Sequence, residues 1–226
     1  MSAGAARLDR RQRADILERV DRYYTSALER HGPTAQGADW SSAESQALRF
    51  QQLLRAVAEG AGGSPAEASF NDYGCGYGAL LDHLRRAGWA GPYAGFDLSA
   101  RMVAEARRLH HDSPRAEFAD REDHLQPADF TLASGIFNVK QDVDESIWRA
   151  YVLDTLERIR ALSRHGFAFN CLTAHADPER MRLHLHYADP LELFEHCRRT
   201  FSRRVALLHD YPLFEFTILV RLDDAR

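Results

Sequence analysis

The chain has 226 residues, of which 45% are hydrophobic and 27% charged, values that suit one globular domain with a sizeable core. Its 29 basic and 33 acidic residues give a formal net charge of −4, so a polyanion such as nucleic acid is not favoured as a partner. No apolar run approaches the length that spans a bilayer, so we expect no membrane segment.

The three cysteines argue against a disulfide framework and against a zinc site. Cys75, Cys171 and Cys197 lie far apart, are odd in number and lack metal-ligand spacing. We therefore predict no bound metal and a reducing compartment. The arginine-rich N-terminus lacks the apolar stretch of a secretory signal, and we expect a cytoplasmic location.

The first 65 residues predict a helical cap rather than a separate domain. The expected elements are a helix over 8–30 that ends at Gly32-Pro33, a loop over 34–40, a second helix over 42–59 and a glycine-rich linker over 60–65. This part is too small and too poor in apolar residues to fold alone. We interpret 1–65 as a cap over the ligand site of the domain formed by 66–226.

From residue 66 onward, predicted strands and helices alternate. Strands are expected near 68–73, 93–98, 115–119, 129–136, 165–172, 203–210 and 214–222, and helices near 79–88, 99–110, 144–163 and 189–200. This alternation predicts an α/β fold, a doubly wound and mostly parallel seven-stranded sheet with helices on both faces. The connection over 211–213 is too short for a crossover, so the last two strands should form an antiparallel hairpin.

A strand, a glycine turn and a helix follow one another over residues 70–87. Asp72 ends the strand, and glycines stand at 74, 76 and 78. Glycine lets a backbone bend sharply and lets a ligand approach it closely. Strand, turn and helix in this order form a corner where backbone N–H groups and a helix N-terminus face a nucleotide-type ligand.

The spacing of the glycines separates two classes of ligand. A dinucleotide fingerprint places the third glycine three residues after the second, whereas here the interval is two. The stretch from Asp72 through Gly74-Cys75-Gly76 to Gly78 resembles motif I, acidic-x-G-x-G-x-G, of the class I S-adenosylmethionine (SAM)-dependent methyltransferases. The alternative is a chance glycine turn in another α/β protein. The resemblance covers roughly residues 66–222 and implies SAM as the cofactor, bound at this turn.

A second acidic strand end lies about 20 residues further on, at Asp97. A carboxylate there can accept hydrogen bonds from the two ribose hydroxyls of an adenosine. The alternative is a simple helix N-cap, but Ser99 can serve as that cap equally well. We therefore expect Asp97 to be free for the ligand.

The resemblance extends to three further segments around the cofactor. The end of the fourth strand, from Ser134 to Asn138, would line the acceptor site beside the methyl group, with Asn138 orienting the acceptor. Asp120, at the end of the third strand, matches a family position that binds the adenine amino group, with a solvated loop acid as the alternative. Leu98 and Met102 are candidate apolar walls for adenine, with an ordinary place in the core as the alternative. The Asn/Asp-Pro-Pro-Tyr/Phe motif of enzymes that methylate the amino groups of bases or glutamine is missing.

The cap and the segment 174–189 supply the remaining candidates. Arg49 could grip the carboxylate of SAM with two parallel hydrogen bonds, although an ordinary salt bridge is an alternative. Several cap residues could form a roof over the acceptor pocket, namely Tyr23, Tyr24, His31 and Trp40, with Gln46 on the helix face of Arg49. We interpret 174–189 as a lid, because His184 and His186 lack a third metal ligand. His31 and Tyr187 are the candidate bases.

The sequence therefore predicts a SAM-dependent methyltransferase that acts on a small-molecule acceptor, mainly by holding it in line with the methyl group. Two alternatives remain open: a non-catalytic protein that uses the SAM fold to bind a partner, and an NAD-type oxidoreductase. The identity of the acceptor and the oligomeric state are not predicted.

Overall fold

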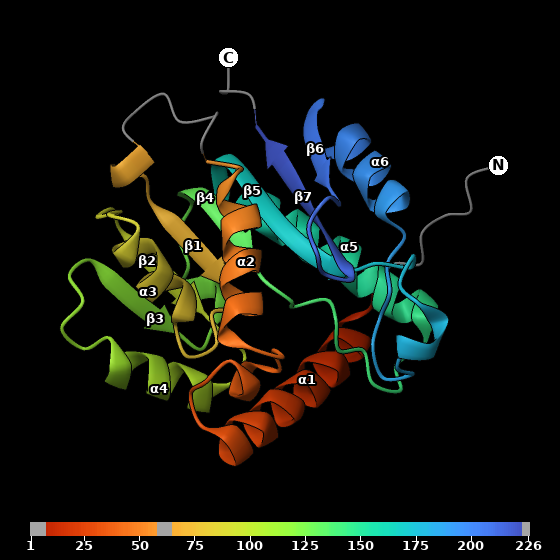
Figure 1. Ribbon diagram of the computed structural model, residues 1–226, viewed down its shortest axis with the longest axis horizontal. Helices are drawn as coiled ribbons and strands as arrows, with labels where there is room; N and C mark the ends of the chain where they lie inside the picture. Colours follow the sequence, from red (N-terminus) through yellow and green to blue (C-terminus); the bar gives the residue numbers. More distant parts are fainter. Residues whose placement is uncertain (1–7, 58–64, 223–226) are drawn as a thin grey trace.

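The computed structural model describes residues 8–57 and 65–222 and shows one seven-stranded sheet with helices on both faces (Figure 1). The strand order is β3-β2-β1-β4-β5-β7-β6. The strands are β1 Phe70–Tyr73, β2 Tyr93–Phe96, β3 Ala116–Ala119, β4 Ala128–Ala133, β5 Ser163–Leu172, β6 Arg204–Leu208 and β7 Glu215–Arg221. The helices are α1 Arg10–His31, α2 Ala43–Leu54, α3 Ala79–Arg86, α4 Ala100–Leu109, α5 Glu145–Ala161 and α6 Pro190–Thr200.

The sheet confirms the predicted α/β architecture. Strands β1 to β5 run parallel, with Asp72 of β1 level with Gly95 of β2 and Leu132 of β4. Strand β7 pairs antiparallel with both β5 and β6, which is the expected terminal hairpin. The order reverses direction on either side of β1, so the carboxyl ends of β1, β2 and β4 form a crevice suited to a ligand.

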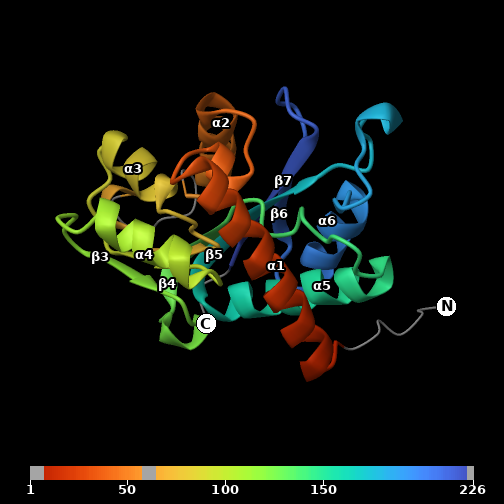
Figure 2. The ribbon, with the colours of Figure 1, turned by 90° about the horizontal axis from the view of Figure 1, so that it is seen from below.

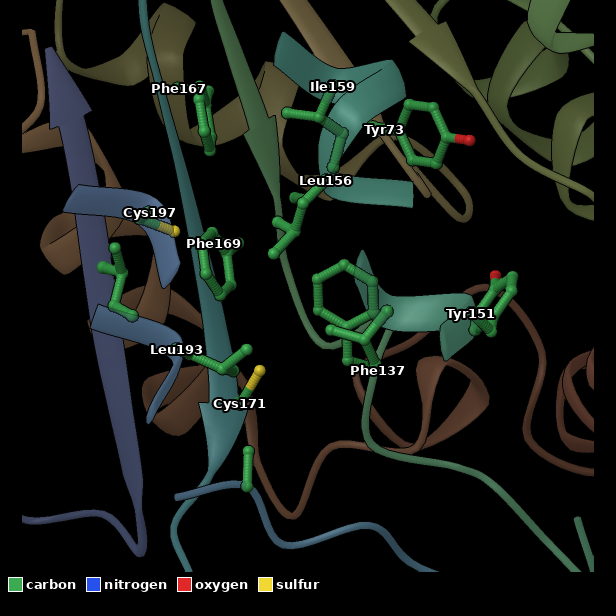
Figure 3. Packing of buried hydrophobic residues seen from close by; sticks show 14 of the residues in the cluster. Tyr73, Phe137, Tyr151, Leu156, Ile159, Phe167, Phe169, Cys171, Leu193 and Cys197 are labelled. Carbon is green, nitrogen blue, oxygen red and sulfur yellow. The ribbon is translucent and has the colours of Figure 1, made fainter. Parts of the chain in front are cut away.

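The two faces of the sheet carry two separate hydrophobic clusters. Helices α2, α3 and α4 cover one face, where Phe70, Phe130 and Leu219 are buried. Helices α5 and α6 cover the other face, together with part of α1. In Figure 3, Leu193 and Cys197 reach the β5 side chains Phe167 and Phe169 from α6, while Leu156 and Ile159 approach from α5. This core holds the strand ends rigidly.

The cap consists of two capped helices. Asp9 forms a capping box with Gln12 at the start of α1, and Ser42 forms one with Ser45 at the start of α2. Helix α1 ends at His31 and is capped by Gly32, whose φ of 67° favours glycine. Figures 1 and 2 show α1 lying across the lower edge of the sheet. Helix α2 ends at Leu54, and most of the expected linker over 60–65 lies outside the described residues.

Candidate functional site

The glycine turn after β1 forms as predicted and is tied to the end of β2, but the N–H groups expected to face a ligand, those of Gly74, Cys75, Gly76 and Gly78, all donate within the protein. The φ angles of Gly74, Gly76 and Gly78 are 85°, 54° and 87°. A Cβ atom on Gly74 would collide with Ile136, whereas the nearest atom to one on Gly76 would be the sulfur of Met102 at 4.0 Å. The N–H of Gly74 donates to the carbonyl of Phe96 at 2.7 Å. The turn is therefore fixed in place and leaves open space at Gly76.

Asp97 lies beside this turn. The N–H of Gly76 donates to its Oδ2 at 2.8 Å, and the N–H of Ser99 donates to its Oδ1 at 2.9 Å. The Ser99 hydroxyl in turn accepts from the N–H of Met102, so Ser99 is the side-chain cap of α4. Burial raises the pKa of Asp97 to about 6, although the two N–H donors act in the opposite direction and lower it.

Asp72 is the second buried carboxylate at the turn. It is 3% exposed, and its Oδ2 accepts a 2.5 Å hydrogen bond from the hydroxyl of Tyr93. Burial raises the pKa of Asp72 to about 7, although the bond from Tyr93 opposes the shift. Asp72 and Asp97 are therefore held in an apolar wall where a cation or a hydrogen-bond donor would favour their ionised forms.

A cavity at the carboxyl ends of the strands brings most of the expected cofactor-binding residues together. It encloses about 900 Å³ of space that no atom occupies, its open mouth included. Eight of the eleven residues expected to bind the cofactor line this cavity: Asp72, Gly74, Cys75, Gly76, Asp97, Leu98, Met102 and Ser134. Most of its other walls are apolar or aromatic side chains from the cap, β1, β2 and α5.

The charges on this cavity are of one sign. Its lining includes the carboxylates of Asp21, Asp72 and Asp97, and none of the described residues that line it is lysine, arginine or histidine. Arg13 lies over the ring of Tyr151 behind the lining and pairs with Asp154 and Glu122, and Arg49 pairs with Glu215. The cavity therefore favours a ligand that carries positive charge.

Sequence reasoning missed several residues of the cavity, above all Asp21 and Tyr151. Asp21 lies on the inner face of α1, next to Leu17 and Tyr24, and accepts a hydrogen bond from the Thr25 hydroxyl at 3.0 Å. The sequence does indicate Asp21, because it is an acidic residue on the face of the 8–30 helix that otherwise carries apolar side chains. Tyr151 carries no comparable signal, since an aromatic residue on α5 reads as core.

The floor and the roof of the cavity meet at Gly135. The N–H of Gly135 donates to Oδ1 of Asn170 at 2.7 Å, which ties the end of β4 to β5. A Cβ atom on Gly135, whose φ is 74°, would collide with the ring of Trp40 from the cap. Next to it, the hydroxyl oxygen of Ser134 is buried without a hydrogen-bond partner. A polar atom at the cavity wall with no partner among the described residues is a candidate contact for a ligand.

Three expected cofactor-binding residues lie outside this cavity. Gly78 begins α3 and packs against His110 and Phe118. Asp120 is exposed and lines an adjoining hollow that shares Leu98 with the cavity. Arg49 forms a buried, two-pronged ion pair with Glu215, so the expected grip on a cofactor carboxylate is replaced by a contact within the protein.

The three expected catalytic residues are not brought together, and none of them lines the cavity. Oδ1 of Asn138 accepts from the N–H of Leu172 at 3.2 Å, so this side chain links the ends of β4 and β5. The hydroxyl of Tyr187 accepts from the N–H of Arg182 within the segment 174–189. His31 is exposed in the last turn of α1. Asn138 and Tyr187 are engaged by backbone N–H groups within the protein, and His31 lies at the exposed end of α1.

The roof expected from four aromatic cap residues is formed by two of them. Tyr24 and Trp40 line the cavity, and Gln46 accepts a hydrogen bond there from Tyr77 at 3.1 Å. Tyr23 turns outward and donates to Asp39. Its neighbour Tyr24 faces inward, as expected for adjacent residues on a helix.

The segment 174–189 packs against the loop after β4. The N–H of His186 donates to the carbonyl of Asn138 at 2.8 Å, and Val139 forms a β-bridge with Leu185. The imidazole of His186 contacts Glu145 at 2.6 Å rather than His184. Within residues 8–57 and 65–222, no three histidine, cysteine, aspartate or glutamate side chains gather as a metal site.

Two further findings concern the described part of the chain. Cys75, Cys171 and Cys197 are all buried and unpaired. None of the helices described combines the length and the apolar character that are needed to cross a membrane.

Comparison with solved structures identifies the same fold at low sequence identity. Magnesium protoporphyrin IX methyltransferase (ChlM) from Synechocystis PCC 6803, solved with bound SAM, has a TM-score of 0.61 at 14% identity, covering 96% of this chain and 99% of that one. The 1,6-didemethyltoxoflavin-N1-methyltransferase of Burkholderia thailandensis, solved with bound 1,6-didemethyltoxoflavin and S-adenosylhomocysteine (SAH), has a TM-score of 0.56 at 17% identity, covering 90% and 91%.

Comparison of sequences gives the family. A protein of Mycobacterium tuberculosis (strain ATCC 25618 / H37Rv) named as a methyltransferase, Rv1506c, is 48% identical over 153 residues, which are 68% of this chain and 92% of that protein. Residues 45–211 match the family model described as a methyltransferase domain. Together with the glycine turn, the acid at 97 and the seven-stranded sheet, these matches confirm the expected family: the chain belongs to the methyltransferase domain family.

Proposed function

We propose that this chain transfers a methyl group from SAM to a small-molecule acceptor. The observation that carries the proposal is the meeting of Gly76 and Asp97 at the wall of one cavity, with a 2.8 Å hydrogen bond between them. A glycine bend with open space at Gly76, beside a buried carboxylate, suits a ligand with a ribose and a polar tail. The cap encloses this ligand from above.

The residues of the cavity fit SAM. Each oxygen of Asp97 accepts one backbone N–H, so the carboxylate keeps acceptor capacity for ribose hydroxyls. The unpartnered Ser134 hydroxyl offers a further polar contact, and Leu98 and Met102 offer apolar walls. When bound, SAM supplies a methyl group on a positively charged sulfur. The acidic lining suits that charge.

The same acidic lining counts against the NAD-type alternative. The pyrophosphate of a dinucleotide is doubly negative and would lie among Asp21, Asp72 and Asp97 without a basic side chain from the lining. The two-residue glycine interval and the antiparallel β7 point the same way. The intact glycine turn also counts against a non-catalytic partner-binding protein.

For the acceptor, we propose a small, flat and uncharged or cationic molecule. Tyr24, Trp40, Tyr73 and Tyr151 give the cavity aromatic faces, and its charged side chains are all carboxylates, which disfavour an anionic acceptor. Two methyltransferases of this fold carry names that specify flat heterocyclic substrates, a magnesium protoporphyrin and a didemethyltoxoflavin. Catalysis would rest on orientation and on exclusion of water by the cap, and no general base is assigned.

Isothermal titration with SAM and with NAD tests the cofactor. We expect SAM to bind in the micromolar range, about 10⁻⁶ to 10⁻⁴ M, and NAD not to bind. Absence of SAM binding at millimolar concentrations would end the proposal. Release of SAH from SAM on incubation with a metabolite extract then separates an enzyme from a binding protein, because a binding protein releases none.

A further inference from the structure

We propose that Glu215 is a positioning residue: through Arg49 it holds Trp40 in place as a fixed roof over Ser134 and Gly135. The functional meaning of this roof rests on the proposed function, since it closes the cavity assigned to SAM and the acceptor. The sequence does not predict that Trp40, Arg49 and Glu215 act together, and it predicts no role for Glu215.

The first link is a buried ion pair. Nε of Arg49 donates to Oε2 of Glu215 at 2.8 Å, and Nη2 donates to Oε1 at 2.5 Å. The side chains are 9% and 1% exposed, and Nη1 of Arg49 donates to the carbonyl of Ser45 at 2.8 Å. The guanidinium plane is therefore fixed by contacts at all three of its nitrogens.

The second link joins this guanidinium to the roof. The Arg49 carbon Cζ lies 4.1 Å from the centre of the Trp40 ring, a stacked cation–π contact. Trp40 lines the cavity, and its ring fills the space where a Cβ atom on Gly135 would lie. The roof thus rests directly on the end of β4.

Both sides of the crevice are anchored to one pair of strands. Gly135 is held by Asn170 of β5, whereas Trp40 is held through Arg49 by Glu215, the first residue of β7. Glu215 pairs with Leu172, two residues beyond Asn170 on β5. The gap between roof and floor is therefore set by the rigid β5–β7 ladder.

Stability alone does not explain this arrangement. A buried ion pair pays a large desolvation cost, and apolar residues of similar volume often stabilise a protein as well or better. Glu215 also begins a strand whose other buried residues are mostly apolar. An apolar pair would not hold the Trp40 ring in this position, and we attribute the buried charges to that function.

The test removes both charges at once, in Arg49→Met/Glu215→Leu, so that no buried charge is left unpaired. Trp89 and Trp148 are buried, so acrylamide quenching of tryptophan emission reports mainly on the half-buried Trp40. We expect an unchanged or higher melting temperature, stronger quenching, and binding of SAM weaker by about fivefold or more. The matched control is Arg198→Met/Glu195→Leu, which removes an exposed two-pronged pair on α6 and should leave the quenching and the binding of SAM unchanged.

Binding of 5′-methylthioadenosine, which lacks the amino-acid carboxylate of SAM, separates positioning from a direct grip by Arg49. Positioning predicts that the double variant loses affinity for both ligands by similar factors. Loss for SAM alone, or wild-type quenching in the double variant, would overturn the proposal. If the double variant does not fold, Arg49→Lys, which cannot make the flat two-pronged contact, must show the stronger quenching. Failure of the wild-type chain to bind either ligand would refute the proposed function, while the quenching still decides the role of Glu215.

Discussion

The N–H of Gly76 donates to Oδ2 of Asp97 at 2.8 Å, so the turn after β1 and the acid after β2 meet at one point. Parallel pairing of β1 with β2 makes this possible, because it aligns Tyr73 with Phe96 and puts both strand ends at the same edge of the sheet. The bond also fixes the orientation of the carboxylate before any ligand arrives. Asp97 is therefore preorganised for binding.

Replacement of Asp97 by alanine should weaken SAM binding by about tenfold or more, since hydrogen bonds to a charged group contribute about 1.5–3 kcal/mol each. Isothermal titration measures the change. Asp112→Ala, which removes an exposed carboxylate just beyond α4, is the control and should bind SAM as the wild type does. Equal affinity of the two variants would show that Asp97 does not contact the ligand.

SAM affinity should rise with pH through about 6, the pKa to which burial raises Asp97. The ionised carboxylate accepts hydrogen bonds from hydroxyls and attracts the sulfonium, whereas the protonated form does neither as well. The dissociation constant, measured from about pH 5 to about pH 8, should fall to a plateau on the alkaline side. Asp97→Asn should remove the step near pH 6 and leave only the step of Asp72, whose pKa is about 7, and a wild-type profile in that variant would contradict the assignment to Asp97.

The stability of the ligand-free protein should respond to pH through Asp72 in the opposite direction. Burial raises the pKa of Asp72 from 3.8 to about 7, so the folded state binds its proton more tightly than the unfolded state does. Its contribution to stability is therefore full below about pH 4 and is lost as the pH rises through about 7. Asp72→Asn mimics the protonated form. Its melting temperature should therefore rise relative to that of the wild type as the pH rises from about 5 to about 8. A constant difference would contradict the buried state of this carboxylate.

Most of the fold follows from the sequence because its signals are local and repeated. Periodic apolar residues, capping residues such as Ser99 and the short connection over 211–213 each specify an element without reference to distant parts. The resemblance of 72–78 to a methyltransferase motif then supplied the family, which the sequence comparisons confirm. The helix predicted over 42–59 ends earlier, at Leu54, because pattern alone locates the end of a helix poorly.

The site was predicted well only where a motif specifies it. The turn and Asp97 are sequence-local, and they meet as expected. The assignment of Arg49 rests on its chemistry and that of Asn138 on its place at a strand end that the family uses, and their partners, Glu215 and Leu172, are distant in sequence. A buried salt bridge and a side chain that satisfies a backbone N–H look in sequence like ligand-binding groups. Only tertiary structure separates these cases.

Asn138→Ala should therefore lower stability without weakening SAM binding. It leaves the part-buried N–H of Leu172 without its acceptor, which costs about 1–3 kcal/mol. Urea unfolding measures the loss, and titration with SAM provides the second readout. Unchanged stability together with lost SAM binding would return Asn138 to the ligand site, against its position in the structure.

Gly135→Ala should destabilise the protein more than Gly88→Ala. Both glycines have positive φ angles, 74° and 85°, so both substitutions carry a backbone cost of about 1–2 kcal/mol. A Cβ atom on Gly88 meets nothing within 4 Å, whereas one on Gly135 collides with Trp40. The lower melting temperature of Gly135→Ala should be accompanied by stronger acrylamide quenching as Trp40 is displaced. Equal effects of the two substitutions would mean that Trp40 does not rest on the end of β4.

Ser134→Ala should weaken SAM binding without lowering stability, which is the reverse of the result expected for Asn138→Ala. The Ser134 hydroxyl oxygen has no hydrogen-bond partner among the described residues, so its removal should not lower the melting temperature of the ligand-free protein. The same change removes a polar contact from the wall of the cavity, and SAM should bind about threefold to tenfold more weakly. Melting temperatures and titrations on one preparation measure both effects. A loss of stability with unchanged affinity would mean that this hydroxyl serves the fold and not the ligand.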